Sequence, residues 1–116
     1  MLTIYHNPRC SKSRQTLALI EESNQAFTIV EYLKTPLTKQ TIEKLITLLG
    51  VSPRDIMRTG ESEYREQHLA NADDSTLISA MVTTPKLIER PIVTDGSNAI
   101  LGRPPENVLS LINKNK

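Results

Sequence analysis

Two short β-rich segments flank one helical segment near the start of the chain, and this order restricts the fold more than any other feature. Residues 2–5 (LTIY) are short, apolar and β-rich. Residues 11–23 have apolar side chains at helical spacing, with Ser11 as the expected N-cap, and residues 27–33 (FTIVEYL) alternate and are β-branched. A strand, a helix and a strand within about 30 residues predict a βαβ unit, hence two parallel strands joined by a right-handed crossover.

The middle of the chain is dominated by helical patterns. Each begins at a capping residue or a proline and carries apolar residues on one face. The expected elements are, in order, a helix capped by Thr38 and ended by Gly50, a short helix from Pro53, a loop with a modest helix over residues 59–72, and a helix capped by Asp73 or Asp74 and ended at Thr84-Pro85.

The end of the chain returns to β-structure. Residues 92–94 and 99–101 are short apolar segments around Asp95-Gly96-Ser97-Asn98, a typical hairpin turn sequence, and Pro104-Pro105 open a last helix. The order βαβ, helices, ββα predicts an α/β protein with a thioredoxin-like mixed sheet, parallel in its first half and antiparallel in its second. We expect one domain over residues 1–116, with a helical insertion at about residues 38–84.

Composition excludes several classes of partner. Aromatic residues make up 3% of the chain and the net charge is +1, so we expect neither a base-stacking surface nor strong attraction to nucleic acid. Apolar runs fall far below the roughly 18 residues that span a bilayer. The first residues lack the basic-then-apolar order of a signal peptide, so we expect a cytoplasmic protein without a membrane partner.

The chain contains a single cysteine, Cys10. One cysteine excludes an internal disulfide, a C-x-x-C zinc site and an internal dithiol redox cycle. If Cys10 performs redox chemistry, the second sulfur must therefore come from another molecule. The sequence contains neither a metal-ligand cluster nor a dinucleotide-binding glycine motif, so we expect no bound metal or cofactor.

Cys10 directly precedes the first predicted helix. The unpaired N–H groups and the dipole at a helix N-terminus favour an anion, either the Cys10 thiolate or an oxyanion held against it. Arg9, Lys12 and Arg14 favour the thiolate in the same way. The alternative is an inert, buried thiol, for which these polar neighbours are a poor environment.

Ser13 lies where a dithiol enzyme has its second cysteine, because residues 10–13 read C-x-x-S. A serine can donate a hydrogen bond to a thiolate but cannot form a disulfide. A phosphatase-like phosphate loop requires an arginine six residues after its cysteine, and position 16 is Thr. The sequence therefore argues against a cysteine-dependent phosphatase.

The segment Tyr5-His6-Asn7-Pro8-Arg9-Cys10, followed by Ser13-Arg14 and Thr16-Leu17, resembles the active-site opening of the glutaredoxin-dependent arsenate reductase family. The resemblance continues through Ile56-Met57-Arg58, residues 88–93 (IERPIV) and Gly102-Arg103-Pro104, and covers essentially the whole chain in register. It implies a thioredoxin-like fold and reduction of arsenate to arsenite by external glutathione and glutaredoxin.

The resemblance also implies roles for individual residues. Cys10 is the expected nucleophile, and Arg58, Arg90 and Arg103 are expected to bind the arsenic oxyanion and its adduct. His6 is expected near the cysteine, and Ser13 is expected to hydrogen-bond the sulfur. Three guanidinium groups can neutralise and orient an oxyanion through paired hydrogen bonds.

Simpler roles compete for some of these residues. His6 could only pack or cap at the strand end, although a protonated His6 could tune Cys10. Arg58 has charged neighbours and could be an ordinary surface arginine. Arg90 precedes Pro91, and thioredoxin-like folds place a cis-proline opposite the active cysteine, so Arg90-Pro91 is a candidate cis peptide bond.

Two other functions remain possible. A glutathione-dependent thiol transferase of the same fold would use the same thiolate. Three arginines, however, are more than are needed to bind one of the carboxylates of glutathione. A non-enzymatic regulator that binds RNA polymerase and senses oxidation would need a paired C-x-x-C, and Ser13 replaces the second cysteine.

Overall fold

The computed structural model describes residues 1–115, and they form two compact units. The first unit combines Met1–Thr35 with the C-terminal segment from Arg90, and the second is Pro36–Glu89. The predicted helical insertion at about residues 38–84 lies within the second unit. Every helix in residues 1–115 is too short or too polar to cross a bilayer.

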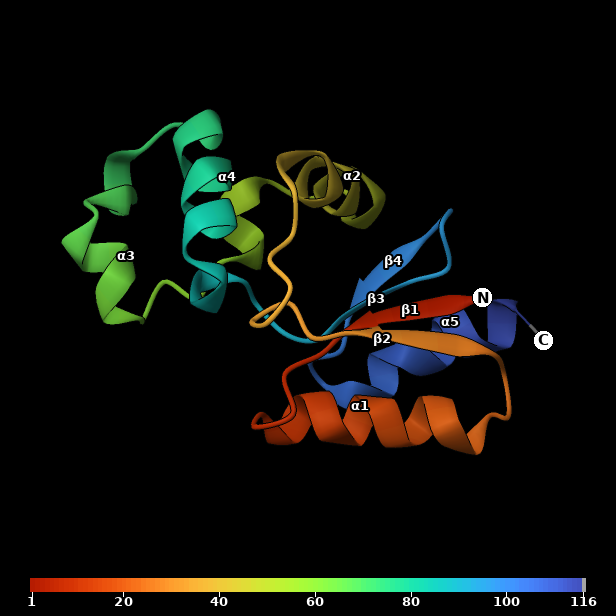
Figure 1. The fold of residues 1–116 in the computed structure, drawn as a ribbon. Helices are drawn as coiled ribbons and strands as arrows, with labels where there is room; N and C mark the ends of the chain where they lie inside the picture. The colour runs from red at the N-terminus through yellow and green to blue at the C-terminus, as the bar shows by residue number, and fades with distance from the viewer. Residues whose placement is uncertain (116) are drawn as a thin grey trace. The chain divides into compact units, whose positions relative to one another are not determined.

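A four-stranded mixed sheet forms the centre of the first unit (Figure 1). Its strands are β1 (Leu2–Tyr5), β2 (Phe27–Val30), β3 (Ile92–Thr94) and β4 (Ala99–Leu101), arranged in the order β2-β1-β3-β4. β1 pairs in parallel with β2, whereas β3 is antiparallel to both β1 and β4. The predicted thioredoxin-like mixed sheet, with a parallel first half and an antiparallel hairpin, is therefore confirmed.

Two helices pack against one face of this sheet, α1 (Ser11–Glu22) and α5 (Val108–Lys114), which follows the 3-10 turn η4 (Pro105–Asn107) (Figure 1). Their apolar faces and the inward side chains of the strands form one aliphatic core. Its buried members are Leu2, Ile4, Ile20, Val93, Val108, Leu111 and Ile112.

Two sequence-based boundaries in this unit are wrong. β2 ends at Val30 instead of residue 33, because the N–H groups of Lys34 and Thr35 both donate to the carbonyl of Glu31 and close a turn. The N-cap of α1 is Cys10 instead of Ser11, with an extended backbone at φ −95° and ψ 123°. The Cys10 side chain therefore lies at the boundary between the loop and the helix.

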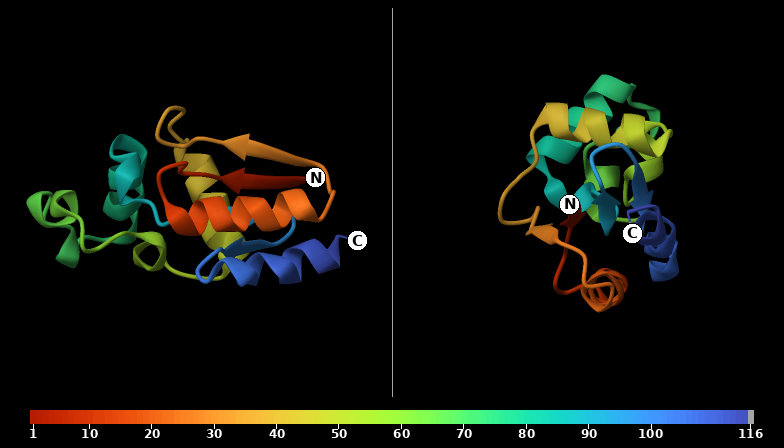
Figure 2. Two further views of the ribbon diagram at one scale, coloured as in Figure 1. Left: turned by 90° about the horizontal axis from the view of Figure 1, so that it is seen from below. Right: turned by 90° about the vertical axis from the view of Figure 1, so that its right-hand side faces the viewer.

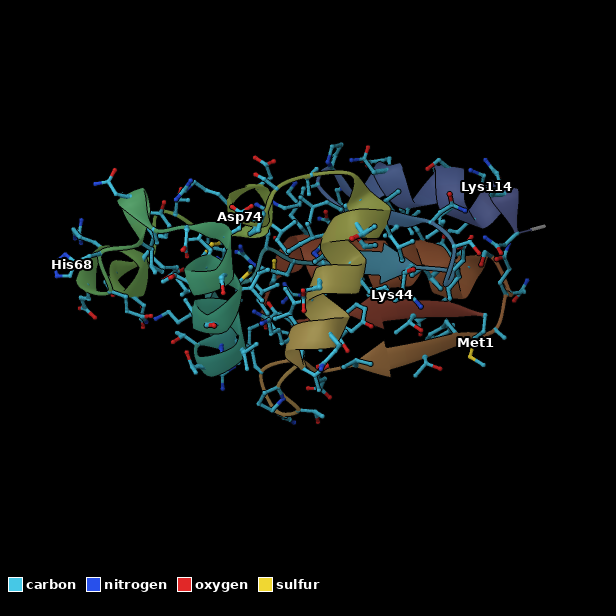
Figure 3. All side chains as sticks on the ribbon, turned by 90° about the horizontal axis from the view of Figure 1, so that it is seen from above. Met1, Lys44, His68, Asp74 and Lys114 are labelled. Carbon is cyan, nitrogen blue, oxygen red and sulfur yellow. The ribbon has the colours of Figure 1, made fainter. Side chains whose placement is uncertain are left out.

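The second unit is helical. Its elements are α2 (Lys39–Leu49), η1 (Pro53–Ile56), α3 (Ser62–Glu66), η2 (Leu69–Asn71), α4 (Asp74–Thr83) and η3 (Pro85–Leu87). α2 and α4 pack together and bury Ile42, Leu45 and Ile46 from α2 and Leu77, Ile78 and Met81 from α4. The polar faces carry exposed side chains such as Lys44 on α2 (Figure 3).

Both predicted caps in the second unit are confirmed. Thr38 accepts a hydrogen bond from the N–H of Thr41, and Asp73 accepts one from the N–H of Thr76. Gly50 ends α2 with a left-handed backbone at φ 69°, a conformation that glycine adopts without steric cost.

Candidate active site

Cys10 is positioned by the short loop that connects β1 to α1. Its N–H donates to the carbonyl of Asn7 at 3.0 Å, and its carbonyl accepts from the N–H of Arg14 at 3.0 Å. The side chain is half-buried. The backbone N–H groups of Lys12 and Ser13, in the first turn of α1, hydrogen-bond the sulfur. The predicted placement of Cys10 at a helix start is therefore confirmed.

The surroundings of Cys10 favour its thiolate. Burial raises the pKa of the Cys10 thiol, but hydrogen bonds from the Ser13 and Lys12 N–H groups and the guanidinium of Arg90 outweigh it. The net result is a pKa below the ordinary value of a cysteine thiol. A lowered pKa increases the thiolate fraction near neutral pH, and the thiolate is the nucleophilic form.

Two of the three predicted arginines lie at Cys10. The Arg90 guanidinium hydrogen-bonds the sulfur. The Nη1 atom of Arg103 lies 4.0 Å from the Cys10 sulfur and also donates to the Arg90 carbonyl at 3.3 Å. Two guanidinium groups therefore meet at the one thiol of the chain, where an oxyanion can be neutralised and oriented.

The register of the β3–β4 hairpin brings these arginines together. Ile92 pairs with Leu101, and the N–H of Gly102 donates to the Pro91 carbonyl at 2.9 Å. The pairing therefore continues one step beyond the strands, and the next residues outward are Arg90 and Arg103. Both arginines precede a cis proline, and the cis Arg90-Pro91 bond was predicted from the sequence.

Gly102 fills a position where no side chain fits. A Cβ atom at Gly102 would lie 2.6 Å from the Thr16 hydroxyl oxygen and 2.8 Å from the Pro91 Cγ atom. Thr16 is fully buried on α1, and its hydroxyl donates to the Lys12 carbonyl at 2.8 Å. The close approach of Gly102 to α1 therefore fixes the path of the chain just before Arg103. Thr16 and Gly102 are 86 positions apart in the sequence, so only the fold brings them together.

His6 and Ser13 form a buried pair beneath the cysteine loop. The His6 Nδ1 atom lies 2.6 Å from the Ser13 hydroxyl oxygen, which also accepts from the N–H of Asn7 at 3.0 Å. Ser13 therefore bonds the sulfur through its backbone N–H, while its hydroxyl joins His6 to the loop. The serine ties the end of β1 to the first turn of α1.

The imidazole of His6 favours its neutral form. Burial is the main cause that lowers the pKa of His6, and Arg14 acts in the same direction, whereas Glu31 and Glu21 raise it. The unprotonated Nδ1 of a neutral ring can accept a hydrogen bond from the Ser13 hydroxyl. His6 thus supports the cysteine loop through hydrogen bonding more than through positive charge.

Arg58 belongs to the second unit, where it follows η1. Its N–H donates to the Leu87 carbonyl at 2.8 Å, and its guanidinium forms an ion pair with Glu61. Glu61 also pairs with Lys86 at 3.7 Å, and Lys86 pairs with Glu63 at 3.0 Å. The predicted role of Arg58 in oxyanion binding stays a prediction.

Residues 1–115 contain no group of three His, Cys, Asp or Glu side chains arranged to hold a metal ion. His68 is exposed, at a left-handed backbone position with φ 55° (Figure 3).

Comparisons with known proteins agree with this site. The model of the ArsC family matches residues 5–111. The chain is 48% identical over 112 residues to the uncharacterized protein YfgD of Escherichia coli (strain K12), covering 94% of each chain. It is 40% identical over 114 residues to an arsenate reductase of Neisseria meningitidis serogroup A, covering 96% of this chain and 97% of the relative. A solved arsenate reductase from Vibrio cholerae superimposes with a TM-score of 0.90 at 45% identity, covering 94% of this chain and 95% of the other.

Proposed function

The chain belongs to the ArsC family, and from this premise we propose that it reduces arsenate to arsenite with glutathione and glutaredoxin, using Cys10 as the nucleophile. Two proteins named arsenate reductases, from Neisseria meningitidis and Vibrio cholerae, match this chain over 97% and 95% of their own length at 40% and 45% identity. The single observation that carries the proposal is the meeting of the Arg90 and Arg103 guanidinium groups at the Cys10 sulfur.

The first step forms a bond between sulfur and arsenic. The Cys10 thiolate attacks the arsenic of arsenate, and one arsenate hydroxyl group takes up a proton and leaves as water. Arg90 and Arg103 bind the remaining oxygens and stabilise the negative charge that they share. The oxidation state of arsenic is unchanged, since sulfur has only replaced oxygen.

Reduction requires two thiols from outside the chain, because Cys10 is its only cysteine. The thiol of glutathione replaces a second arsenate oxygen, which leaves as water. The thiolate of glutaredoxin then attacks the glutathione sulfur, and the sulfur–arsenic bond breaks. The electron pair of that bond stays on arsenic and reduces As(V) to As(III), while glutathione and glutaredoxin share a disulfide. Water finally hydrolyses the Cys10–As(III) bond and releases arsenite and the free thiol.

We place this activity in the cytoplasm, where glutathione keeps thiols reduced. The two arginines also favour arsenate over the disulfide substrate of a thiol transferase. Both guanidinium groups lie at the Cys10 sulfur, where a disulfide substrate would place only an uncharged sulfur atom.

The test compares Cys10→Ser with wild type and with Ser11→Ala, an exposed serine one residue away. We expect Cys10→Ser to release no arsenite above the uncatalysed rate in the presence of arsenate, glutathione and glutaredoxin, and Ser11→Ala to retain activity. Intact mass spectrometry of wild type with arsenate and glutathione should detect an arsenic adduct that Cys10→Ser lacks. Normal turnover by Cys10→Ser would refute the proposal, and rapid turnover of a glutathionylated peptide but not of arsenate would favour a thiol transferase.

A further inference from the structure

A cavity of about 370 Å³ lies in the first unit at the carboxyl ends of the parallel strands β1 and β2, which run side by side in Figure 2. Its walls come from the residues that directly follow each strand: His6, Asn7, Pro8 and Arg9 after β1, and Glu31, Leu33 and Lys34 after β2. The volume falls within the range of about 300–1,000 Å³ that is usual for small-molecule sites. The carboxyl ends of parallel strands are also where ligands of α/β sheets commonly bind.

The walls of the cavity carry both charge signs. Arg9 and Lys34 are cationic and Glu31 is anionic, while Leu33 and Pro8 supply apolar surface. The Lys34 Nζ atom lies 3.5 Å from a Glu31 carboxylate oxygen, and the side chains are 79% and 37% exposed. An ion pair this exposed contributes little to stability, so both groups remain available to a charged ligand.

The wall of the cavity and the support of the sulfur belong to the same loop. Arg9 directly precedes Cys10 in the chain. His6, on the cavity wall, bonds the hydroxyl of Ser13, and the backbone N–H of Ser13 bonds the Cys10 sulfur. A ligand in the cavity therefore contacts the segment that presents the nucleophile.

We propose that this cavity binds glutathione, the thiol that must reach arsenic after Cys10 has bound it; the inference rests on the proposed function. Glutathione carries two carboxylates and one ammonium group at neutral pH. The cavity matches them one for one, with Arg9 and Lys34 for the carboxylates and Glu31 for the ammonium. Leu33 and Pro8 cover the methylene groups between them. The chemistry of the step is unchanged, because the cavity supplies binding and orientation only.

The binding test uses S-methylglutathione, which has the charges of glutathione but no reactive thiol. We expect its addition to shift the backbone amide signals of residues 6–9 and 31–34 in the NMR spectrum of the whole chain. Glu31→Lys and Lys34→Glu should each weaken this binding by about tenfold, because a reversed charge replaces an attraction by a repulsion. The matched controls Glu22→Lys on α1 and Lys44→Glu on α2 make the same charge changes at exposed positions and should leave the affinity unchanged.

Turnover gives a second readout. Lys34→Glu should raise the KM for glutathione about tenfold, with kcat at saturating glutathione and the KM for arsenate unchanged. The proposed site would be refuted if S-methylglutathione did not bind or shifted only amide signals elsewhere. It would also be refuted if Lys44→Glu weakened the binding as much as Lys34→Glu does. Arsenate reduction with a glutathione KM that Lys34→Glu does not alter would overturn the site and leave the proposed function standing. Binding of S-methylglutathione in the cavity of a protein that does not reduce arsenate would support the site and refute the function.

Discussion

Replacing Gly102 by alanine tests whether close packing behind the site positions Arg103. The new methyl group would lie 2.6 Å from the Thr16 hydroxyl oxygen and 2.8 Å from the Pro91 Cγ atom, both too close for van der Waals contact. Neither neighbour is the free end of a flexible side chain, since Thr16 is fully buried and bonded to the Lys12 carbonyl. The backbone around residue 102 must therefore shift.

The cost of the Gly102→Ala change follows from two opposing effects. Overpacking in a filled site costs about 1–3 kcal/mol. The reduced entropy of the unfolded chain returns about 0.4–1 kcal/mol. We expect a net loss of about 1–2 kcal/mol in the free energy of unfolding, from these two ranges. A displacement of about 1 Å at Arg103 should also lower kcat/KM for arsenate by about 100-fold.

Urea unfolding and the arsenite-release assay measure both effects. Gly60→Ala is the matched control, because no heavy atom lies within 4 Å of its new methyl group and Gly60 is outside the left-handed region. Adding Thr16→Ala to Gly102→Ala removes the closest contact, so the double variant should be more stable than the sum of the two single changes predicts. If Gly102→Ala matches Gly60→Ala in both stability and activity, the argument that packing positions Arg103 is refuted.

Two further predictions concern stability. Hydrogen bonds from the Asn115 side-chain amide and the Ser97 N–H lower the pKa of Asp95 from 3.8 to about 2. The charged carboxylate therefore stabilises the hairpin above pH 4, and this contribution disappears as the pH falls towards 2. Asp95→Asn should therefore be less stable than wild type at pH 7. In thermal unfolding, the difference in stability between the two proteins should shrink between pH 4 and pH 2, and a difference that stays constant would contradict the lowered pKa of Asp95. Thr38→Ala removes the acceptor for the Thr41 N–H and should cost about 1 kcal/mol in urea unfolding. Thr47→Ala, an exposed site inside α2 whose hydroxyl bonds only the Glu43 carbonyl, should cost less, and equal losses would argue against the cap.

Local sequence signals predicted much of this fold. Turn residues at 95–98 fix the hairpin register, and counting outward from that turn places Arg90 opposite Arg103. The caps at Thr38 and Asp73 follow from local hydrogen bonding.

Other features depend on contacts that a linear pattern does not contain. The turn at Glu31 has neither glycine nor proline, so the β-branched pattern of residues 27–33 extends beyond the strand that forms. Ser11 has the better capping side chain, yet the loop from Asn7 ends at Cys10 and leaves the sulfur at the helix start. The Ser13 hydroxyl forms hydrogen bonds with His6 and with the N–H of Asn7, and these groups meet only in the folded loop.

The central claim is that the fold holds Cys10 as a reactive thiolate between Arg90 and Arg103, and a titration of its thiol tests this most directly. Because the chain has one cysteine, thiolate absorbance or the pH dependence of alkylation reports Cys10 alone. The protein unfolded in urea supplies the reference. We predict that the midpoint of the folded protein lies below that of the unfolded chain, and that Arg90→Gln moves it upward because the neighbouring positive charge is lost. A folded midpoint equal to or above the unfolded one would contradict the account.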